Sequence, residues 1–230
     1  HTYGVVKQAE ELAGRMHLSA EDTDLARLIA LLHDIGRFDQ LKRNDTFEPG
    51  TMDHAAYGVK VLFDEGMIRR FLPDDKWDSI IYTAIAHHSD YELPEISDPQ
   101  TLLHAKLIRD EDKLDNCRVK LVDSTSTFIN VSEEELGTQN ITQKVYETVF
   151  ENKCILSADR VTQMDYWVSY IVYFFDINFK ESFDIIAEND YLNRIIDRIP
   201  YSNPVTKEQM ENIRVYMQNF INSHTNSQSF

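Results

Sequence analysis

The chain has 230 residues, 42% of them hydrophobic, and its 12 Phe, 11 Tyr and 2 Trp supply enough apolar surface for a substantial core. A formal net charge of −16 argues against binding to nucleic-acid duplexes and to anionic membranes, because both need a basic protein surface. A small anionic substrate is still compatible with this charge, because bound metal cations can reverse the field locally.

The cysteines and the apolar stretches indicate the compartment. Cys117 and Cys154 show no CxxC spacing, so we expect two free thiols in a reduced cytoplasm. The longest nearly apolar stretch, Tyr166 to Phe175, is far too short to cross a bilayer. We therefore expect a soluble, cytoplasmic protein that does not associate with membranes.

Helical periodicity dominates the first half of the chain, and no convincing strand pattern of period two occurs. Ser19 and Asp22 resemble a capping box before a helix that should end near Gly36, which we predict to be a left-handed cap. The polar residues from Leu41 to Pro49 predict an irregular loop, which we expect to cover the functional site. The other helices expected here lie behind His1, after Thr51 or Asp53, from Pro73 to His87-His88, and at about Leu102–Asn116 following Asp98-Pro99.

The second half starts with a connector. Residues 121–140 are rich in Ser, Thr and Glu, which predicts short helical pieces, and further helices are expected at Val145–Phe150, Asp159–Phe175, Phe179–Glu188 and Lys207–Ile221. We interpret the aromatic stripe from Tyr166 to Phe174 as core, with packing against a second copy of the chain in a homo-oligomer as the alternative. The prediction is an all-α bundle over residues 1–120 with a helical extension over residues 121–230 packing on it.

Histidines and aspartates recur on the helices of the first half. His33-Asp34 stands at the end of an apolar helical run, where an imidazole and a carboxylate make a poor core but a good start to a metal site. Asp112 lies in a charged patch of an otherwise apolar helix, where a carboxylate is costly unless it is ligated or paired. The full candidate set is His1, His33, Asp34, His54, His87, His88 and Asp112.

The order of these residues resembles the HD-domain superfamily of metal-dependent phosphohydrolases, whose pattern is a His, an adjacent His-Asp and a distant Asp. The matching positions here are His1, His33-Asp34 and Asp112, within roughly residues 1–120. His54 and the doublet His87-His88 resemble the additional ligands of members that hold two metals. The resemblance implies an HD-domain-like helical bundle.

Carried over by position, the resemblance implies that one metal takes His1, His33, Asp34 and Asp112. A second metal would share Asp34 and add His54, His87 and His88. Mixed imidazole and carboxylate ligands suit one or two divalent transition-metal ions, with Fe or Mn first and Ni, Co or Zn as alternatives. Such a centre activates a water for in-line attack on phosphorus. Arg37 or Lys113 would neutralise charge that develops on the phosphoryl oxygens.

The sequence differs from two subfamilies of this superfamily, and the differences narrow the range of candidate substrates. Ser89-Asp90-Tyr91 follows the doublet, where hydrolases of cyclic di-GMP carry Gly-Tyr-Pro, and Arg37-Phe38-Asp39 stands where guanosine tetraphosphate hydrolases carry Glu-Asp. We predict a phosphohydrolase that cleaves a phosphate ester or anhydride of a small anionic molecule, with nucleotides first. The alternatives are a diadenosine polyphosphate hydrolase, a non-catalytic nucleotide-binding regulator that keeps the metal ligands, and a di-iron oxygenase on the same scaffold.

Overall fold

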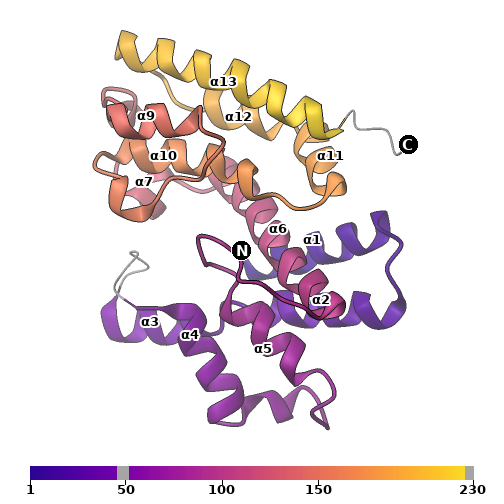
Figure 1. Cartoon of the computed structure of the whole chain (residues 1–230). Helices are drawn as coiled ribbons and strands as arrows, with labels where there is room; N and C mark the ends of the chain where they lie inside the picture. Colours follow the sequence, from indigo (N-terminus) through magenta and orange to yellow (C-terminus); the bar gives the residue numbers. More distant parts are fainter. Residues whose placement is uncertain (46–51, 226–230) are drawn as a thin grey trace. The chain divides into compact units, whose positions relative to one another are not determined.

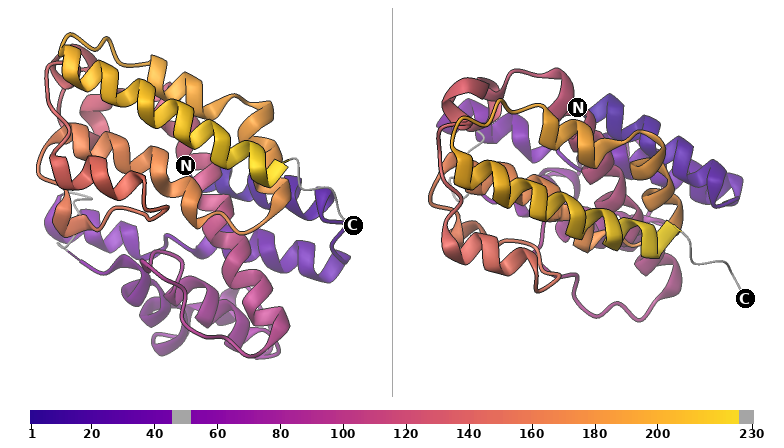
Figure 2. Two further views of the ribbon diagram at one scale, coloured as in Figure 1. Left: turned by 45° about the horizontal axis from the view of Figure 1, so that its top comes forward. Right: turned by 90° about the horizontal axis from the view of Figure 1, so that it is seen from above.

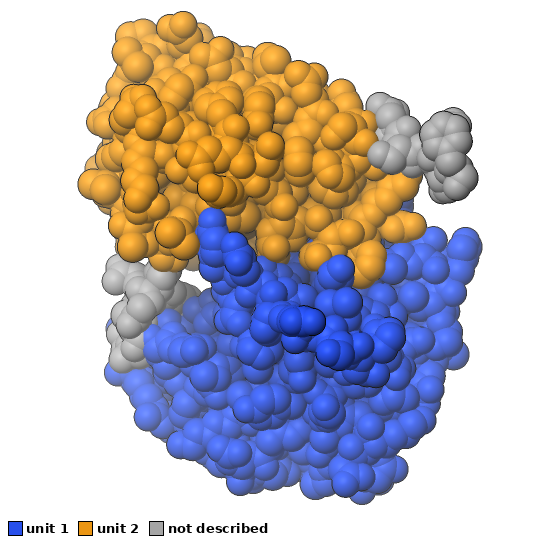
Figure 3. Space-filling model, in the orientation of Figure 1, with its two compact units in different colours: residues 1–112 blue, residues 113–230 orange. Residues whose placement is uncertain are grey.

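The structure is a computed structural model that describes residues 1–45 and 52–225, and every regular element in these ranges is helical (Figure 1). The predicted all-α class is therefore confirmed. The chain forms two compact units, residues 1–112 and residues 113–230, which Figure 3 colours separately. One helix, α6 (Pro99–Val122), begins in the first unit and ends in the second.

The first unit starts with two helices, α1 (Thr2–Arg15) and α2 (Ala20–Leu32), that pack along each other (Figures 1 and 2). The predicted stripe on α1 is buried, with Val5, Ala9 and Leu12 fully inaccessible to solvent. The Ser19 hydroxyl accepts a hydrogen bond from the Asp22 backbone N–H at 3.0 Å, as the capping pattern predicted. This cap fixes where α2 begins and therefore which residues stand at its far end.

Gly36 is not the left-handed cap that we predicted. α2 ends at Leu32, residues 33–35 form a turn, and Gly36 is the first residue of α3 (Gly36–Asn44). A Cβ atom at Gly36 would lie 2.1 Å from the backbone oxygen of His54, in α4 (His54–Val59), so glycine is needed for the close approach of two backbones. α3 also occupies the start of the loop predicted at Leu41–Pro49, and residues 46–49 of that loop lie outside the described residues.

The next elements are set by local caps. The Asp53 carboxylate accepts from the Ala56 backbone N–H at 2.9 Å and starts α4, which continues into a π-helical turn, η1 (Lys60–Asp64), and is followed by η2 (Met67–Arg70). α5 (Asp78–Ala86) begins later than predicted, because residues 73–77 form bends and turns. α6 begins at Pro99 and extends beyond both predicted ends.

The second unit is helical too, and α7 (Thr125–Ile129) and α8 (Glu133–Leu136) are the short pieces predicted for residues 121–140. Trp167 and Phe174 are fully buried, in agreement with the interpretation of the aromatic stripe as core. The helix α12 (Tyr191–Asp197) was not predicted, because seven residues give too little periodicity. The remaining elements are α9 (Gln143–Val149), η3 (Ser157–Asp159), α10 (Gln163–Val172), η4 (Tyr173–Asp176), α11 (Lys180–Glu188), α12 (Tyr191–Asp197) and α13 (Pro204–Thr225), the last of which packs on α11 and α12 (Figure 2).

Within the part of the chain that the structure describes, no helix combines the length and the apolar run that a bilayer span requires.

Candidate metal centre

His33 follows the last residue of α2, and its side chain is fully buried. Its Nδ1 lies 2.8 Å from the backbone oxygen of Ala30. Because a carbonyl oxygen only accepts, Nδ1 must carry the proton, which leaves the lone pair of the neutral ring on Nε2. No described residue gives that buried Nε2 a hydrogen bond, and the nearest carboxylate oxygens, from Asp34 and Asp112, lie 3.7 and 3.8 Å away.

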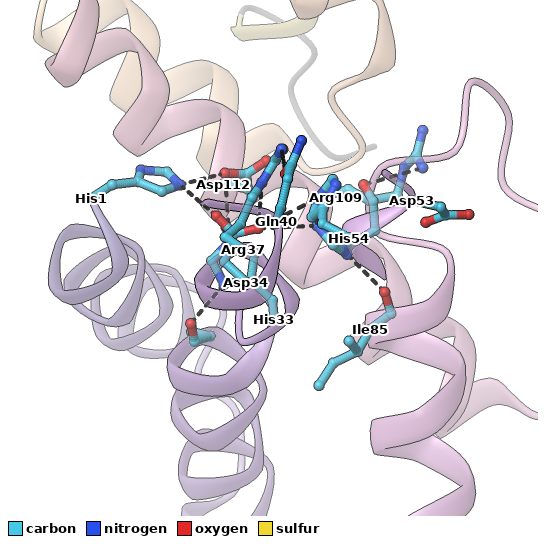
Figure 4. A network of polar contacts seen from close by, with 12 residues as sticks. His1, His33, Asp34, Arg37, Gln40, Asp53, His54, Ile85, Arg109 and Asp112 are labelled. Atoms are coloured by element: carbon cyan, nitrogen blue, oxygen red, sulfur yellow. Dashed lines mark hydrogen bonds and ion pairs between the residues drawn. The ribbon is translucent and has the colours of Figure 1, made fainter. Parts of the chain in front are cut away.

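The carboxylate of Asp34 faces two groups of nitrogen atoms with its two oxygens (Figure 4). Oδ2 lies 3.9 Å from His1 Nε2 and 3.7 Å from His33 Nε2. Oδ1 lies 3.4 Å from His54 Nε2 and 3.7 Å from His88 Nε2. One acidic side chain therefore stands between two sets of imidazoles.

On the first side, His1, His33 and Asp112 come together from the start of α1, the end of α2 and the middle of α6. His1 Nε2 lies 2.9 Å from Asp112 Oδ1. One donor atom from each of the three residues falls within 4.8 Å of the others, so the group could hold a metal ion.

On the second side, His33, Asp34 and His88 form another such group. The Nδ1 of His88 donates to the backbone oxygen of Ile85 at 2.7 Å, which repeats the arrangement of His33 and leaves Nε2 of His88 as an acceptor. That Nε2 lies 3.1 Å from His54 Nε2. The Nε2 atoms of His54 and His88 thus converge with Oδ1 of Asp34.

The electrostatics of the cluster favour the ligand forms of these groups. Burial alone would raise the pKa of Asp34, but contact with His88 and the charge of His33 outweigh it and hold the pKa well below its usual value. Burial would also raise the pKa of Asp112, but its contacts with His1 and His33 likewise keep the pKa low. For His54, burial and the nearby charge of Arg37 lower the pKa to about 4. At neutral pH the carboxylates are ionised and His54 is neutral, as metal binding requires.

His33 differs from His54, because at His33 the neighbouring carboxylates outweigh burial and the pKa rises. Burial would lower the pKa of His33, but the nearby carboxylates of Asp112 and Asp34 raise the pKa above its usual value. The two carboxylates therefore call for positive charge at Nε2. A bound divalent cation would supply that charge at the same place.

Two predicted site residues make their contacts elsewhere. His87 Nδ1 lies 2.6 Å from Asp90 Oδ2, and the ring is 35% exposed, so the structure brings His88 and not His87 to Asp34. The prediction placed both histidines at the cluster, but the turn after α5 directs the two neighbouring side chains to different partners. The ammonium of Lys113 lies 2.7 Å from Asp176, a partner within the second unit.

Arg37 lies where the sequence placed it, with Nε 3.4 Å from Asp34 Oδ1. Its Nη1 donates to the Oε1 of Gln40 at 2.8 Å, and Gln40 is fully buried. Sequence reasoning missed Gln40, although its spacing of three residues from Arg37 on a helix would place both on one face. It also missed Arg109, a buried residue of α6 whose guanidinium contacts the backbone of the turn after α5.

The donor set fits a divalent transition metal. Four imidazoles and two carboxylates meet within one unit, and the hydrogen bonds at Nδ1 of His33 and His88 point a lone pair inward in each case. The buried, unpartnered Nε2 of His33 is costly without a cation in this part of the structure.

The profile of the HD domain family matches residues 1–117, just over half of the chain. No curated protein and no solved structure was found to match the chain. The matched segment contains the whole cluster from His1 to Asp112. The chain belongs to the HD-domain family, within the superfamily of metal-dependent phosphohydrolases.

Proposed function

We propose that this protein is a metal-dependent phosphohydrolase that cleaves a phosphate ester or anhydride of a small molecule, with nucleotides as the first substrate class. The observation that carries the proposal is the carboxylate of Asp34, whose two oxygens face two separate groups of imidazoles. A bridging carboxylate between two nitrogen-rich positions is the arrangement that a two-cation hydrolytic centre needs.

The proposed ligands divide between the two sides. His1, His33 and Asp112 hold one cation, His54 and His88 hold the other, and Asp34 serves both. When bound, divalent cations supply positive charge to phosphoryl oxygens and make a water molecule more acidic. Fe and Mn are the first metals to test, followed by Ni, Co and Zn, because all accept mixed nitrogen and oxygen ligands.

The protein's own residues set the geometry. The backbone oxygens of Ala30 and Ile85 hold the rings of His33 and His88 in one tautomer, so neither ring has to reorganise when a cation enters. Arg37 is 31% exposed beside Asp34, and Gln40 fixes its guanidinium. We assign to Arg37 the stabilisation of negative charge on the phosphoryl oxygens, and not to Lys113, because the structure pairs Lys113 with Asp176.

The test is phosphate release. Metal-free protein is reconstituted anaerobically with Mn²⁺ or Fe²⁺ and supplied with a panel of nucleotides and sugar phosphates. We expect metal-dependent release from at least one nucleotide, and none from the Asp34→Asn variant. Full metal occupancy with no phosphate released from any substrate would contradict the proposal, and oxygen uptake with an organic substrate would favour an oxygenase instead.

A further inference from the structure

The turn that carries His88 is held from inside by a buried arginine. α5 ends at Ala86, and both histidines lie in the turn that follows, so the direction of the His88 ring depends on how this turn is held as well as on its bond to Ile85. Arg109, on α6, is 2% exposed, and its Nη1 lies 2.9 Å from the backbone oxygen of His87 and 2.8 Å from that of Asp90. The backbone oxygen of His88 lies at 3.5 Å from the same atom.

A buried guanidinium is expensive unless its N–H groups are used. Bonds from a guanidinium to carbonyl oxygens are charge-assisted and about twice as strong as neutral ones. Three carbonyls of one turn converge on a single nitrogen of this group. The side chain therefore acts as a clamp on the backbone from His87 to Asp90.

The outer face of the same turn has a second brace. His87 Nδ1 lies 2.6 Å from Asp90 Oδ2, and both side chains are partly exposed. The two histidines of the doublet thus have different partners. His87 closes the turn toward solvent, and His88 directs Nε2 toward Asp34 and His54.

We propose that Arg109 is a positioning residue for the cation site formed by His54 and His88. It acts through the backbone of the His87–Asp90 turn. This inference rests on the proposed two-cation function. Arg109 also stands three residues before Asp112 on α6, so both occupy one helix face. A single turn of α6 supplies a ligand to one cation side and the clamp for the other.

The test counts cation sites without measuring turnover. Metal-free protein is titrated with Mn²⁺, and free Mn²⁺ is measured by electron paramagnetic resonance. We expect two sites in the wild type and one site in His88→Ala, which identifies the site that depends on His88. Arg109→Lys keeps a positive charge but loses the planar fork, and it should weaken only that site, by roughly 10- to 100-fold.

Two further variants make the result decisive. His87→Ala, at a partly exposed position that tolerates change, should weaken the same site by a smaller factor, and it tests the turn even if Arg109→Lys fails to fold. Arg27→Lys, a half-exposed arginine paired with Glu10, is the matched control and should leave both sites unchanged. Circular dichroism monitors folding in each case.

The outcomes separate the two proposals. A wild-type protein with fewer than two sites would overturn the two-cation function and this inference with it. Two wild-type sites that both keep their affinity in Arg109→Lys and in His87→Ala would overturn the inference alone. Equal weakening of both sites in Arg109→Lys would also overturn it, because a general loss of stability explains that result.

Discussion

Asp34 and Asp165 are both withdrawn from solvent, but their surroundings differ in kind. Asp165, in the second unit, is fully buried, and its Oδ1 accepts from the Thr142 backbone N–H at 2.8 Å. Its Oδ2 accepts from the backbone N–H groups of Val161 and Thr162 at 2.9 and 3.0 Å. Asp34 instead faces imidazole nitrogens at 3.4 to 3.9 Å.

The difference separates a carboxylate whose partners are fixed donors from one that faces unprotonated nitrogens. Asp165 has its lone pairs met by fixed backbone donors, and it closes the capping box that starts α10. The groups around Asp34 include two rings whose inward nitrogens are acceptors, so they cannot satisfy it by donating. Converging acceptors in a buried place are stabilised when a cation lies between them.

The largest expected effect comes from removing the charge at each aspartate. Asp34→Asn should lose bound metal and lower turnover to that of the metal-free protein, while its thermal unfolding stays cooperative. Asp165→Asn should retain metal but lose roughly 3 kcal/mol of stability, because buried backbone donors lose their charged acceptor. Metal analysis and thermal denaturation measure both. Full metal occupancy in Asp34→Asn would break the comparison.

The second prediction concerns the backbone contact that brings Asp34 to His54. Gly36→Ala would put a Cβ atom 2.1 Å from the backbone oxygen of His54, so we expect a loss of about 3 kcal/mol and weaker binding of the second cation. The matched control is Gly14→Ala. A Cβ there meets nothing within 4 Å, so the change should stabilise α1 by about 0.5–1 kcal/mol. Denaturant unfolding of both variants is the measurement, and equal stabilities would contradict the prediction.

The third prediction separates Arg37 from the ligands. Arg37→Gln should keep both metals and lower turnover by about 10- to 100-fold, because it removes charge stabilisation without removing a donor to the cation. Arg43→Gln, on the same helix and paired with the partly exposed Asp39, should leave turnover unchanged. Steady-state kinetics at full metal occupancy provide the test. Unchanged kinetics in Arg37→Gln would show that its contact with Asp34 is purely structural.

The smallest expected effect concerns Asp22. This carboxylate contacts an imidazole, as Asp34 does, but hydrogen-bond donors already occupy its oxygens. It accepts from Ser19 Oγ at 2.7 Å and from Gln100 Nε2 at 2.8 Å, and His104 Nε2 lies at 3.2 Å. Burial outweighs the contact with Asp22 and lowers the pKa of His104 below its usual 6.5.

Just below pH 6.5 the unfolded chain therefore binds a proton at His104 that the folded chain does not, so this group makes the protein less stable as the pH falls. His104→Gln should remove that contribution, and the melting temperatures of variant and wild type should approach each other from pH 7.5 to pH 5.5 if the variant starts lower. Metal content should not change. The exposed His17→Asn is the control, and any loss of metal in His104→Gln would break the distinction between satisfied and unsatisfied carboxylates.

Much of the fold was predictable because its signals are local. The cap at Ser19, the apolar stripe of α1 and the proline that starts α6 each depend on residues within one or two turns. Gly36 was misinterpreted because a glycine after a helix suggests a cap, whereas its actual role depends on α4, eighteen residues later. Pairwise contact between distant backbones leaves no periodic trace in one sequence.

The candidate site divides in the same way. The positions of His33, Asp34 and Asp112 followed from their order along the chain, and the structure brings them together. The choice between His87 and His88 could not be made, because it depends on how the turn after α5 is folded and on the buried Arg109. The ion pair between Lys113 and Asp176 could not be predicted for a similar reason, since Asp176 lies far along the chain.

The carbonyl bonds at the outer nitrogens of His33 and His88 have a spectroscopic consequence. Each ring holds one hydrogen in a short contact away from bulk water, so that hydrogen should exchange slowly and give its own proton resonance far downfield. Adding a diamagnetic ion such as Zn²⁺ would shift each signal as its side fills. The protein thus contains two built-in reporters that distinguish the order in which ions enter.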